Sequence, residues 1–522
     1  MAITKVTSAL LNSTALTSKA FGTSSIMIGD DATGTIDAAN YNTGLGVDVF
    51  AALTTGDGNT AVGFAVLDAT TTGGGNVAMG QQTMTSNTTG SNNTAIGHVA
   101  LGDNTTADEN TAVGYLALNA NTTGAVNVAI GSNALADNTT GSSNVAVGRE
   151  ALHANTTAAF NIAVGKHAMR ANTTGTSNTA VGHSALLVNT TGAYNVAVGW
   201  TALDANETGA TNTAIGAEAL SANTTGNDNV AVGFDALKTA TTGSNNVAVG
   251  RSALDANTTA SNNTAIGHYA LVANTTGHSN TAAGTNALDT CTTGSYNVAI
   301  GTNCMPAMTT PDGNTAIGVG AGILLTTGGG NTCLGANAGA DLTTGATNTL
   351  LGYGADTGVA ADNNHNVIGY NVTGYDQNYT TVGIGANKSY LYIGATTWAG
   401  TSDERYKKDI ESSTAGLSFI NELRPVTYKW KLQGEIPSTS KDYVEGSTEV
   451  YRNTTVNHGF VAQEVKEVIE NHSEIQDGFG MWAESADGEQ SLAEGALIPI
   501  LTKAVQELSA EVEKLKKQLE NK

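Results

Sequence analysis

The sequence predicts a mainly β protein: a β-solenoid rod of 17-residue repeats, followed by a small α+β domain that ends in a coiled-coil helix. A glycine recurs every 17 residues from Gly46 to Gly352 without a slip, which makes nineteen copies. Every copy combines a strand-like run with turn residues. The composition then changes: the first 400 residues hold eight Lys and Arg, whereas the last 122 hold fourteen. A second domain therefore begins near residue 401.

A typical copy reads NVAVGREALHANTTAAF from Asn144, and SIMIG, which ends at Gly29, adds one earlier step. Positions in a coil are numbered 1 to 17 from this Asn. The alternation in N-V-A-V-G predicts a short strand closed by glycine. The following Ala-Leu pair predicts a second short strand, and Asn-Thr-Thr-Gly predicts a turn. Because these residues break helices, one copy is best explained as one coil of a solenoid, about 4.8 Å high.

Stacked coils place identical residues on top of one another. We expect Val or Ile at position 4 and Leu at position 9 to fill the interior, and Asn at position 1 to form a hydrogen-bonded ladder. The Ala at position 3 then points outward, where another chain could approach it closely or where it simply faces solvent. These patterns assign residues 25–365 to the rod, 1–24 to an N-terminal attachment segment and 366–401 to a transition segment.

The transition segment is rich in tyrosine. Aromatic clusters can bind sugars, but the open end of a solenoid also needs bulky side chains to cover it. We favour a cap over a sugar site. The tyrosines are Tyr370, Tyr375, Tyr379, Tyr390 and Tyr392.

The bulk composition excludes several classes of partner. A net charge of −23 argues against nucleic acid and anionic membranes, because both would repel the chain. Cys291, Cys304 and Cys333 show neither a CxxC pair nor an even framework, so we expect no metal site, no cofactor and no disulfide scaffold. No apolar run approaches about 18 residues, and the first residues lack a continuous apolar stretch. We therefore expect no membrane insertion and no secretory signal.

The last segment, about 498–522, predicts a coiled coil. Its apolar residues are spaced 4, 3, 4, 3 and 4 apart, with Glu and Lys beside them, which is an a/d heptad seam. One chain cannot bury such a seam, so partner chains are expected; the seam leaves dimer and trimer open. The seam residues are Leu501, Val505, Leu508, Val512, Leu515 and Leu519.

Two parts of the chain resemble known families. The NTAVG and NVAIG repeats are similar to the head repeats of trimeric autotransporter adhesins, which form β-rolls packed as trimers. SDERYKKDI, FINELRPVTYKWK, HGFVAQEV and ALIPILTKAVQEL resemble, in this order, the endosialidase-type intramolecular chaperone of bacteriophage tail fibres and tailspikes. The second resemblance spans Ser402 to about Lys517. It implies that residues 402–522 assemble three chains and then cut themselves off.

In the chaperone family the cut precedes the serine of the S-D-x-R-x-K motif, which here places it between Thr401 and Ser402. The resemblance implies Ser402 as nucleophile and Lys407 as base. It also gives His458 and Gln463 supporting roles.

The residues themselves leave two interpretations of this motif. A serine hydroxyl needs a base, and a lysine serves as one when burial or a neighbouring cation such as Arg405 or Lys408 lowers its pKa. Alternatively, Ser-Asp-Glu caps a helix and the lysines form a solvated face.

The resulting functional prediction is a structural rod of a phage tail fibre or spike, trimerised and cut once in cis. Its partners would be two further copies, other virion tail proteins through the N-terminus, and a host surface glycan or protein receptor. It would be assembled in the host cytoplasm and reside in the virion tail. The alternatives are a bacterial trimeric adhesin, a glycan-degrading tailspike or an ice-binding solenoid. Glycan hydrolysis needs paired carboxylates, whereas Asp103, Asp137, Asp204 and Asp255 repeat only loosely.

Overall fold

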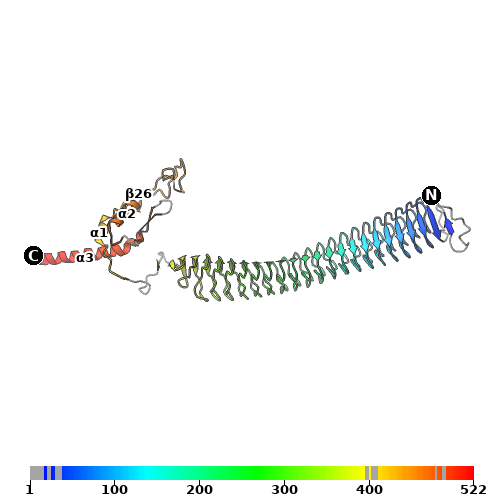
Figure 1. Cartoon of the computed structure of the whole chain (residues 1–522), viewed down its shortest axis with the longest axis horizontal. Helices are drawn as coiled ribbons and strands as arrows, with labels where there is room; N and C mark the ends of the chain where they lie inside the picture. Colours follow the sequence, from blue (N-terminus) through cyan, green and yellow to red (C-terminus); the bar gives the residue numbers. More distant parts are fainter. Residues whose placement is uncertain are drawn as a thin grey trace, which may run out of the picture. The chain divides into compact units, whose positions relative to one another are not determined.

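The chain forms two compact units, Met1–Thr401 and Ser402–Lys522. The computed structural model describes residues 17–19, 25–29, 38–393, 399–400, 409–438, 440, 442–475, 479–484 and 490–521. The first unit is the long series of arrows in Figure 1, and the second carries the helices α1, α2 and α3. Each unit is described by itself.

The first unit is a parallel β-solenoid, as predicted. From β2 to β22 each strand pairs in parallel with the strand 17 residues further on, for example Val145 with Ile162. β1 (Thr17–Lys19) adds an antiparallel strand to β2 (Ile26–Gly29). The nineteen three-residue strands are β3 Thr43–Leu45, β4 Thr60–Val62, β5 Val77–Met79, β6 Thr94–Ile96, β7 Thr111–Val113, β8 Val128–Ile130, β9 Val145–Val147, β10 Ile162–Val164, β11 Thr179–Val181, β12 Val196–Val198, β13 Thr213–Ile215, β14 Val230–Val232, β15 Val247–Val249, β16 Thr264–Ile266, β17 Thr281–Ala283, β18 Val298–Ile300, β19 Thr315–Ile317, β20 Thr332–Leu334 and β21 Thr349–Leu351.

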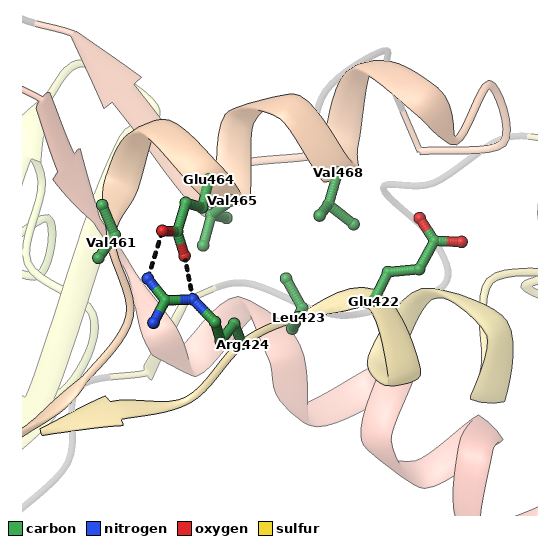
Figure 2. A pocket seen from close by; sticks show the side chains of 7 residues that line it. All are labelled: Glu422, Leu423, Arg424, Val461, Glu464, Val465 and Val468. Carbon is green, nitrogen blue, oxygen red and sulfur yellow. Dashed lines mark hydrogen bonds and ion pairs between the residues drawn. The ribbon is translucent and has the colours of Figure 1, made fainter.

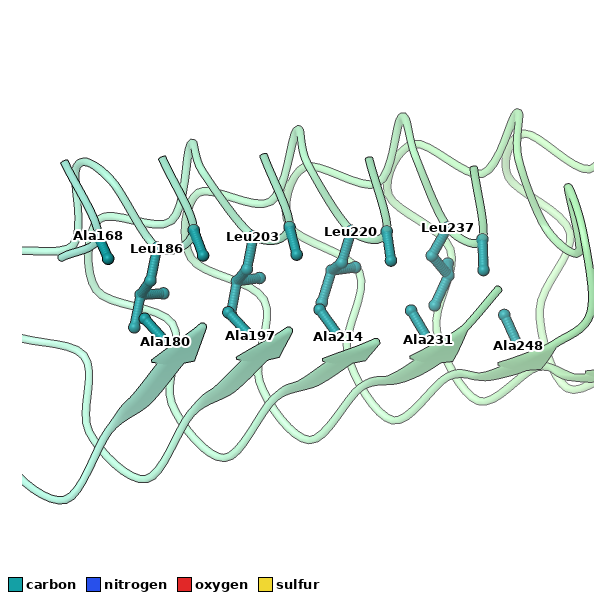
Figure 3. Packing of buried hydrophobic residues seen from close by; sticks show 14 of the residues in the cluster. Ala168, Ala180, Leu186, Ala197, Leu203, Ala214, Leu220, Ala231, Leu237 and Ala248 are labelled. Carbon is teal, nitrogen blue, oxygen red and sulfur yellow. The ribbon is translucent and has the colours of Figure 1, made fainter. Parts of the chain in front are cut away.

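The interior of the coil differs from the prediction at the strand. The Ala at position 3, such as Ala197, is fully buried, whereas Val or Ile at position 4, such as Ile215, is exposed or half-buried. Leu at position 9 is buried, as predicted. Figure 3 shows why: Ala197 and Ala214 on the strands point at Leu203 and Leu220 across a narrow coil, which leaves room for only one large side chain. The predicted outward Ala, and with it a close approach of another chain there, is therefore wrong.

The predicted second strand is also absent from the described coils. Positions 6 to 11 form turns in which positions 7 and 9 have positive φ, for example 54° at Glu150 and 51° at Leu152. Left-handed backbone costs an ordinary residue about 1 kcal/mol or more. Hydrogen bonds to the next coil hold it here, because the Leu152 amide donates to Ala168 at 3.0 Å and the leucine side chain is buried. Local propensity is overruled by stacking.

The asparagine ladder at position 1 is confirmed. Asn195 donates both its backbone amide and its Nδ2 to Oδ1 of Asn178, at 2.9 and 3.2 Å, and the same pattern runs along the rod. Each side chain also donates to a carbonyl of its own coil's turn, as Asn178 does to Gly192 at 2.9 Å. Ser25 begins the ladder and His365 ends it. A second ladder, at position 12, was not predicted; there Asn189 donates to Asn172 at 2.8 Å.

Replacing Asn178 with alanine is expected to open the rod locally. The substitution removes the buried acceptor of the Asn195 amide and the donor to Gly192, and each orphaned polar group costs about 1–3 kcal/mol. Hydrogen exchange of the neighbouring coils should accelerate, while distant coils stay protected. Asn189→Ala is the matched control, because position 12 already accommodates Leu325 and Ala240. Equal acceleration in both variants would contradict a special role for the first ladder.

Glycine at position 5 is required by two constraints at once. Gly199 has a φ of 143°, a region that other residues rarely enter. A Cβ there would lie 2.4 Å from the carbonyl oxygen of Gly216 in the next coil. The 17-residue recurrence of glycine is therefore a record of coil-to-coil contact.

The tyrosine-rich segment ends the parallel ladder. After β22 (Asn366–Tyr370) the spacing shortens to 14 residues, and β23 (Tyr379–Ile384) and β24 (Asn387–Tyr392) form an antiparallel hairpin joined by β25 (Ala399–Gly400). Tyr375 stacks on Tyr390 at 3.7 Å between ring centroids, and Tyr379 meets both rings edge-on. Because these rings cover one another, the arrangement fits the favoured cap better than a free sugar platform.

The second unit is a small α+β domain. Its helices are α1 (Leu417–Glu422), α2 (Ala462–Asn471), the 3₁₀ helix η2 (Glu494–Leu497) and α3 (Ile498–Glu520). Its strands form two antiparallel pairs, β26 (Val426–Tyr428) with β27 (Asn457–Gly459), and β28 (Trp482–Glu484) with β29 (Gln490–Leu492). Its core consists of Ala415, Phe419, Leu423, Val465, Met481, Leu497 and Ile500.

Candidate functional site

Four of the predicted site residues, Thr401, Ser402, Arg405 and Lys407, lie outside the described residues. The surroundings of the predicted supporting residues are described. His458 belongs to β27 and faces Thr427 of β26 across the antiparallel pair. Gln463 is the second residue of α2 and is exposed.

His458 lines a cavity of about 470 Å³ at the edge of the β26–β27 pair. The His458 side chain is exposed, so a polypeptide segment could reach its imidazole from solvent. Pro425, Phe460 and Glu494 line the same cavity. A cavity of this size can hold several residues of an extended chain. It is the described place where a supporting role for His458 would be exercised.

Glu494 is a polar group of this cavity that sequence reasoning missed. It begins η2, and its carboxylate lies against the backbone of Gly459, because a Cβ at Gly459 would come within 3.2 Å of Oε1. Nothing in the local pattern E-G-A-L distinguishes it from a surface acid. Only the folding of η2 next to β27 brings a carboxylate into the cavity that contains His458.

A second cavity lies between α1 and α2, but it is too small for a substrate. It measures about 40 Å³, enough for very few waters. Figure 2 shows Arg424 paired with Glu464 at its mouth, with Leu423, Val465 and Val468 behind. Arg424 Nε donates to Glu464 Oε2 at 2.9 Å, and its Nη2 donates to Oε1. This bidentate pair fixes the segment that follows α1 against the start of α2.

The short helix α1 depends on α3 for its N-terminal contact. The amide of Leu417 donates to Oε2 of Glu507 at 2.8 Å, which satisfies one of the unpaired amides that begin a helix. Gly416 is needed next to it, since a Cβ there would lie 2.4 Å from the same oxygen. The inner face of α3, with Ile500 and Ala504 buried, therefore belongs to its own domain.

His472 joins α1 to the end of α2. Its side chain is 10% exposed, Nδ1 lies 2.8 Å from Oε1 of Glu474, and Nε2 lies 3.3 Å from Oε1 of Glu422. The hydrogen bond with Glu474, with a further contribution from Glu422, outweighs burial and raises the pKa of His472 above its ordinary value. The ring also meets Phe419 edge-on in the core.

The stability of this domain is expected to fall as pH rises. Because the pKa of His472 is higher in the folded than in the unfolded state, the stabilisation is complete below about 6.5, the unfolded value, and is lost as pH rises through the folded pKa. Denaturant midpoints of the full chain, followed by the domain's tryptophans, should decrease over that range. In His472→Gln the midpoint should stay flat there. A wild-type midpoint that rises would contradict this assignment.

The outer face of α3 carries the predicted seam, and the structure leaves it uncovered. Leu501, Val505, Leu508, Val512, Leu515 and Leu519 are 43 to 75% exposed. The helix thus has two apolar faces in its first turns, one used by its own domain and one free in the single chain. The described helices include none that is both long and apolar enough to cross a membrane. The described residues also hold no group of three His, Cys, Asp or Glu placed for a metal ion.

Comparison with known proteins identifies the second unit. Residues 402–474 match the family model described as the chaperone of endosialidase. The match begins at Ser402 and covers α1, β26, β27 and α2. No curated protein and no solved structure matches the chain.

Proposed function

We propose that this chain is one subunit of a homotrimeric, self-maturing fibre of the bacteriophage tail type. The C-terminal unit would align three chains, the solenoid would wind, and the bond between Thr401 and Ser402 would then be cut. The observation that carries the proposal is the endosialidase-type chaperone, which directly follows the solenoid and continues into a helix with an unpaired seam. A domain of this family serves assembly, so its place behind a repetitive rod supports an assembly role.

The seam of α3 supports association of several chains. Burying one leucine of this kind contributes about 1.5–3 kcal/mol relative to leaving it exposed. Six such positions recur over the helix at heptad spacing. Because the opposite face, with Ile500 and Ala504, already packs on its own domain, these residues remain available to other copies.

The outer face of the solenoid sheet supports the same conclusion for the rod. Position 4 holds an aliphatic residue in every coil from Leu45 to Ile368, and its exposed members include Ile130, Ile215 and Ile300. An apolar stripe of this length far exceeds the few hundred Å² usual on a monomer. Three rods packed along this stripe would cover it. The Ile and Val of position 4, and not the Ala of position 3, would then form the contact.

Identical coils make register the difficulty of such an assembly. A slip by one coil would again place Val or Ile opposite Val or Ile, so the stripe by itself hardly specifies alignment. A trimeric helix at one end would fix all three chains before their long-range contacts form. Removal of the aligning domain would make the product kinetically stable, because reassembly would lack its template.

The proposed cut uses the serine next to the broken bond. With Lys407 taking the hydroxyl proton, Oγ of Ser402 can attack the carbonyl carbon of Thr401. The acyl group moves from nitrogen to oxygen, the lysine returns the proton to the amine, and water hydrolyses the resulting ester. His458, Gln463 and the Glu494 carboxylate would position this segment in the cavity next to β27.

The remaining parts of the proposal concern partners. Residues 1–24 would attach the fibre to other virion tail proteins, and the rod or its cap would contact a glycan or protein of the host surface. The test is the mass of the purified protein under native and denaturing conditions. A trimer of 401-residue subunits and a separate fragment of residues 402–522 are expected. A stable, uncut monomer would refute the proposal.

A further inference from the structure

The charge of the rod is uneven. The coils hold five Lys and Arg, and three of them lie between Asp137 and Asp204, together with a single acid, Glu150. The coils before this band contain acids and no Lys or Arg. The band is therefore a basic zone on an acidic rod, and the assembly mechanism gives it no role.

Exposed side chains of the band stand in one column. Arg149, Lys166, His183 and Trp200 occupy position 6 of four successive coils, and all four are exposed. Because successive strands pair with an offset of 17 residues, these side chains follow one another about 4.8 Å apart. We name this set the basic-aromatic column. Position 6 contains no acid in any coil.

The one acid of the band is already neutralised within it. Oε1 of Glu150 accepts from Arg149 at 2.9 Å, and its Oε2 accepts from Arg170 at 2.8 Å. Burial alone would raise the pKa of Glu150, but the hydrogen bond from Arg149 and the charge of Arg170 hold it below its ordinary value. Glu150 thus compensates one of three cations. Within the described part of the chain, Lys166 forms no ion pair, so its charge is free for a ligand.

We propose that the basic-aromatic column binds an anionic glycan. Carboxylate, phosphate or sulfate groups of the glycan would pair with Arg149 and Lys166, and a sugar ring would lie on the exposed face of Trp200. The column offers a charge every coil and an aromatic platform at one end, which suits an extended chain of alternating charged and apolar surface. The inference rests on the proposed surface-binding fibre and names its ligand class.

Two other occupants fit less well. A nucleic acid carries charge along its whole length, and beyond four coils it would meet the acids at Asp137 and Asp204. A second copy of the rod would bring the same cations, and pairing of like charges is unfavourable. The position-4 stripe, not the column, is the surface suited to other copies.

The repeat itself supplies conservative test variants. Position 6 already carries Ser132, Thr285 and Thr302, so serine fits the fold there. Lys166→Ser and Trp200→Ser remove the free charge and the platform. Arg251→Ser is the matched control, because it removes a cation from position 6 outside the band.

Binding would be measured with the purified assembled protein against polygalacturonate, teichoic acid and dextran sulfate, with neutral dextran and duplex DNA in parallel. Lys166→Ser should weaken binding to at least one anionic glycan tenfold or more and reduce its salt dependence. Trp200→Ser should weaken binding with the salt dependence unchanged, and Arg251→Ser should bind normally. Absence of glycan binding, full binding by Lys166→Ser, or equal binding to DNA or neutral dextran would overturn the inference. Native mass of the same samples separates this failure from a failure of trimer assembly.

Discussion

Ser402→Ala is expected to leave the chain at its full 522 residues, whereas the wild-type protein separates into fragments of 401 and 121 residues. Removing the hydroxyl removes the only atom of that residue able to take over the acyl group of Thr401, so the effect should be all or none. Denaturing mass spectrometry of freshly purified protein distinguishes the two products. The trimer should persist, because the seam of α3 is untouched.

The companion variants separate chemistry from folding. Lys407→Ala should block the cut as well, since an unassisted hydroxyl is a weak nucleophile. Ser402→Cys retains a nucleophile and should cut to some extent. Ser412→Ala removes an exposed hydroxyl nearby and should cut normally. Complete cutting by Ser402→Ala would exclude Ser402 from the chemistry, whatever the oligomeric state.

The repeat allowed much of the rod to be predicted, because its period is a direct consequence of stacking. Nineteen glycines in register required one coil per 17 residues, and the Asn ladder followed from placing identical amides on top of one another. The orientation of the strand was predicted wrongly. Asn178 and Ala180 share a face by alternation, and once the asparagine is inside, the alanine must be inside too.

The errors have a common physical cause. Hydrophobicity favoured Val and Ile for the interior, but the coil is so narrow that Ala opposite Leu fills it (Figure 3). The expected strand at Ala-Leu became a left-handed turn, because Leu152 gains a coil-to-coil hydrogen bond that an isolated segment lacks. Propensity describes the single segment, whereas stacking decides the coil.

The candidate site shows the opposite balance. Its residues could be named only from ordered motifs, and no spacing rule brings His458 and Glu494 to one cavity. Their meeting depends on β27 pairing with β26 and on η2 folding beside it. Such tertiary proximity leaves no local trace in the sequence, which is why Glu494 was missed.

Placing glutamate at Leu508 and Leu515 is expected to abolish the trimer and, with it, the folded rod. Two charges in a three-chain seam would have to be buried next to their own copies, and the apolar contribution of both leucines, about 1.5–3 kcal/mol each per chain, would be lost. Without alignment the exposed position-4 stripes of separate chains would associate out of register. Native mass should show no defined trimer, and the product should be aggregated and sensitive to protease.

The control adds the same two charges to the same helix away from the seam. Gln506→Glu and Ala510→Glu lie on exposed positions between the seam residues, so they change net charge equally and leave the seam apolar. This variant should trimerise and cut like the wild type. If the seam variant also gave a protease-resistant trimeric rod, the solenoid would align itself, and the C-terminal domain would serve something other than register. Because every coil offers the same aliphatic residue to its neighbour, such self-alignment would require a feature at the Tyr-rich end or in residues 1–24 to fix the starting coil.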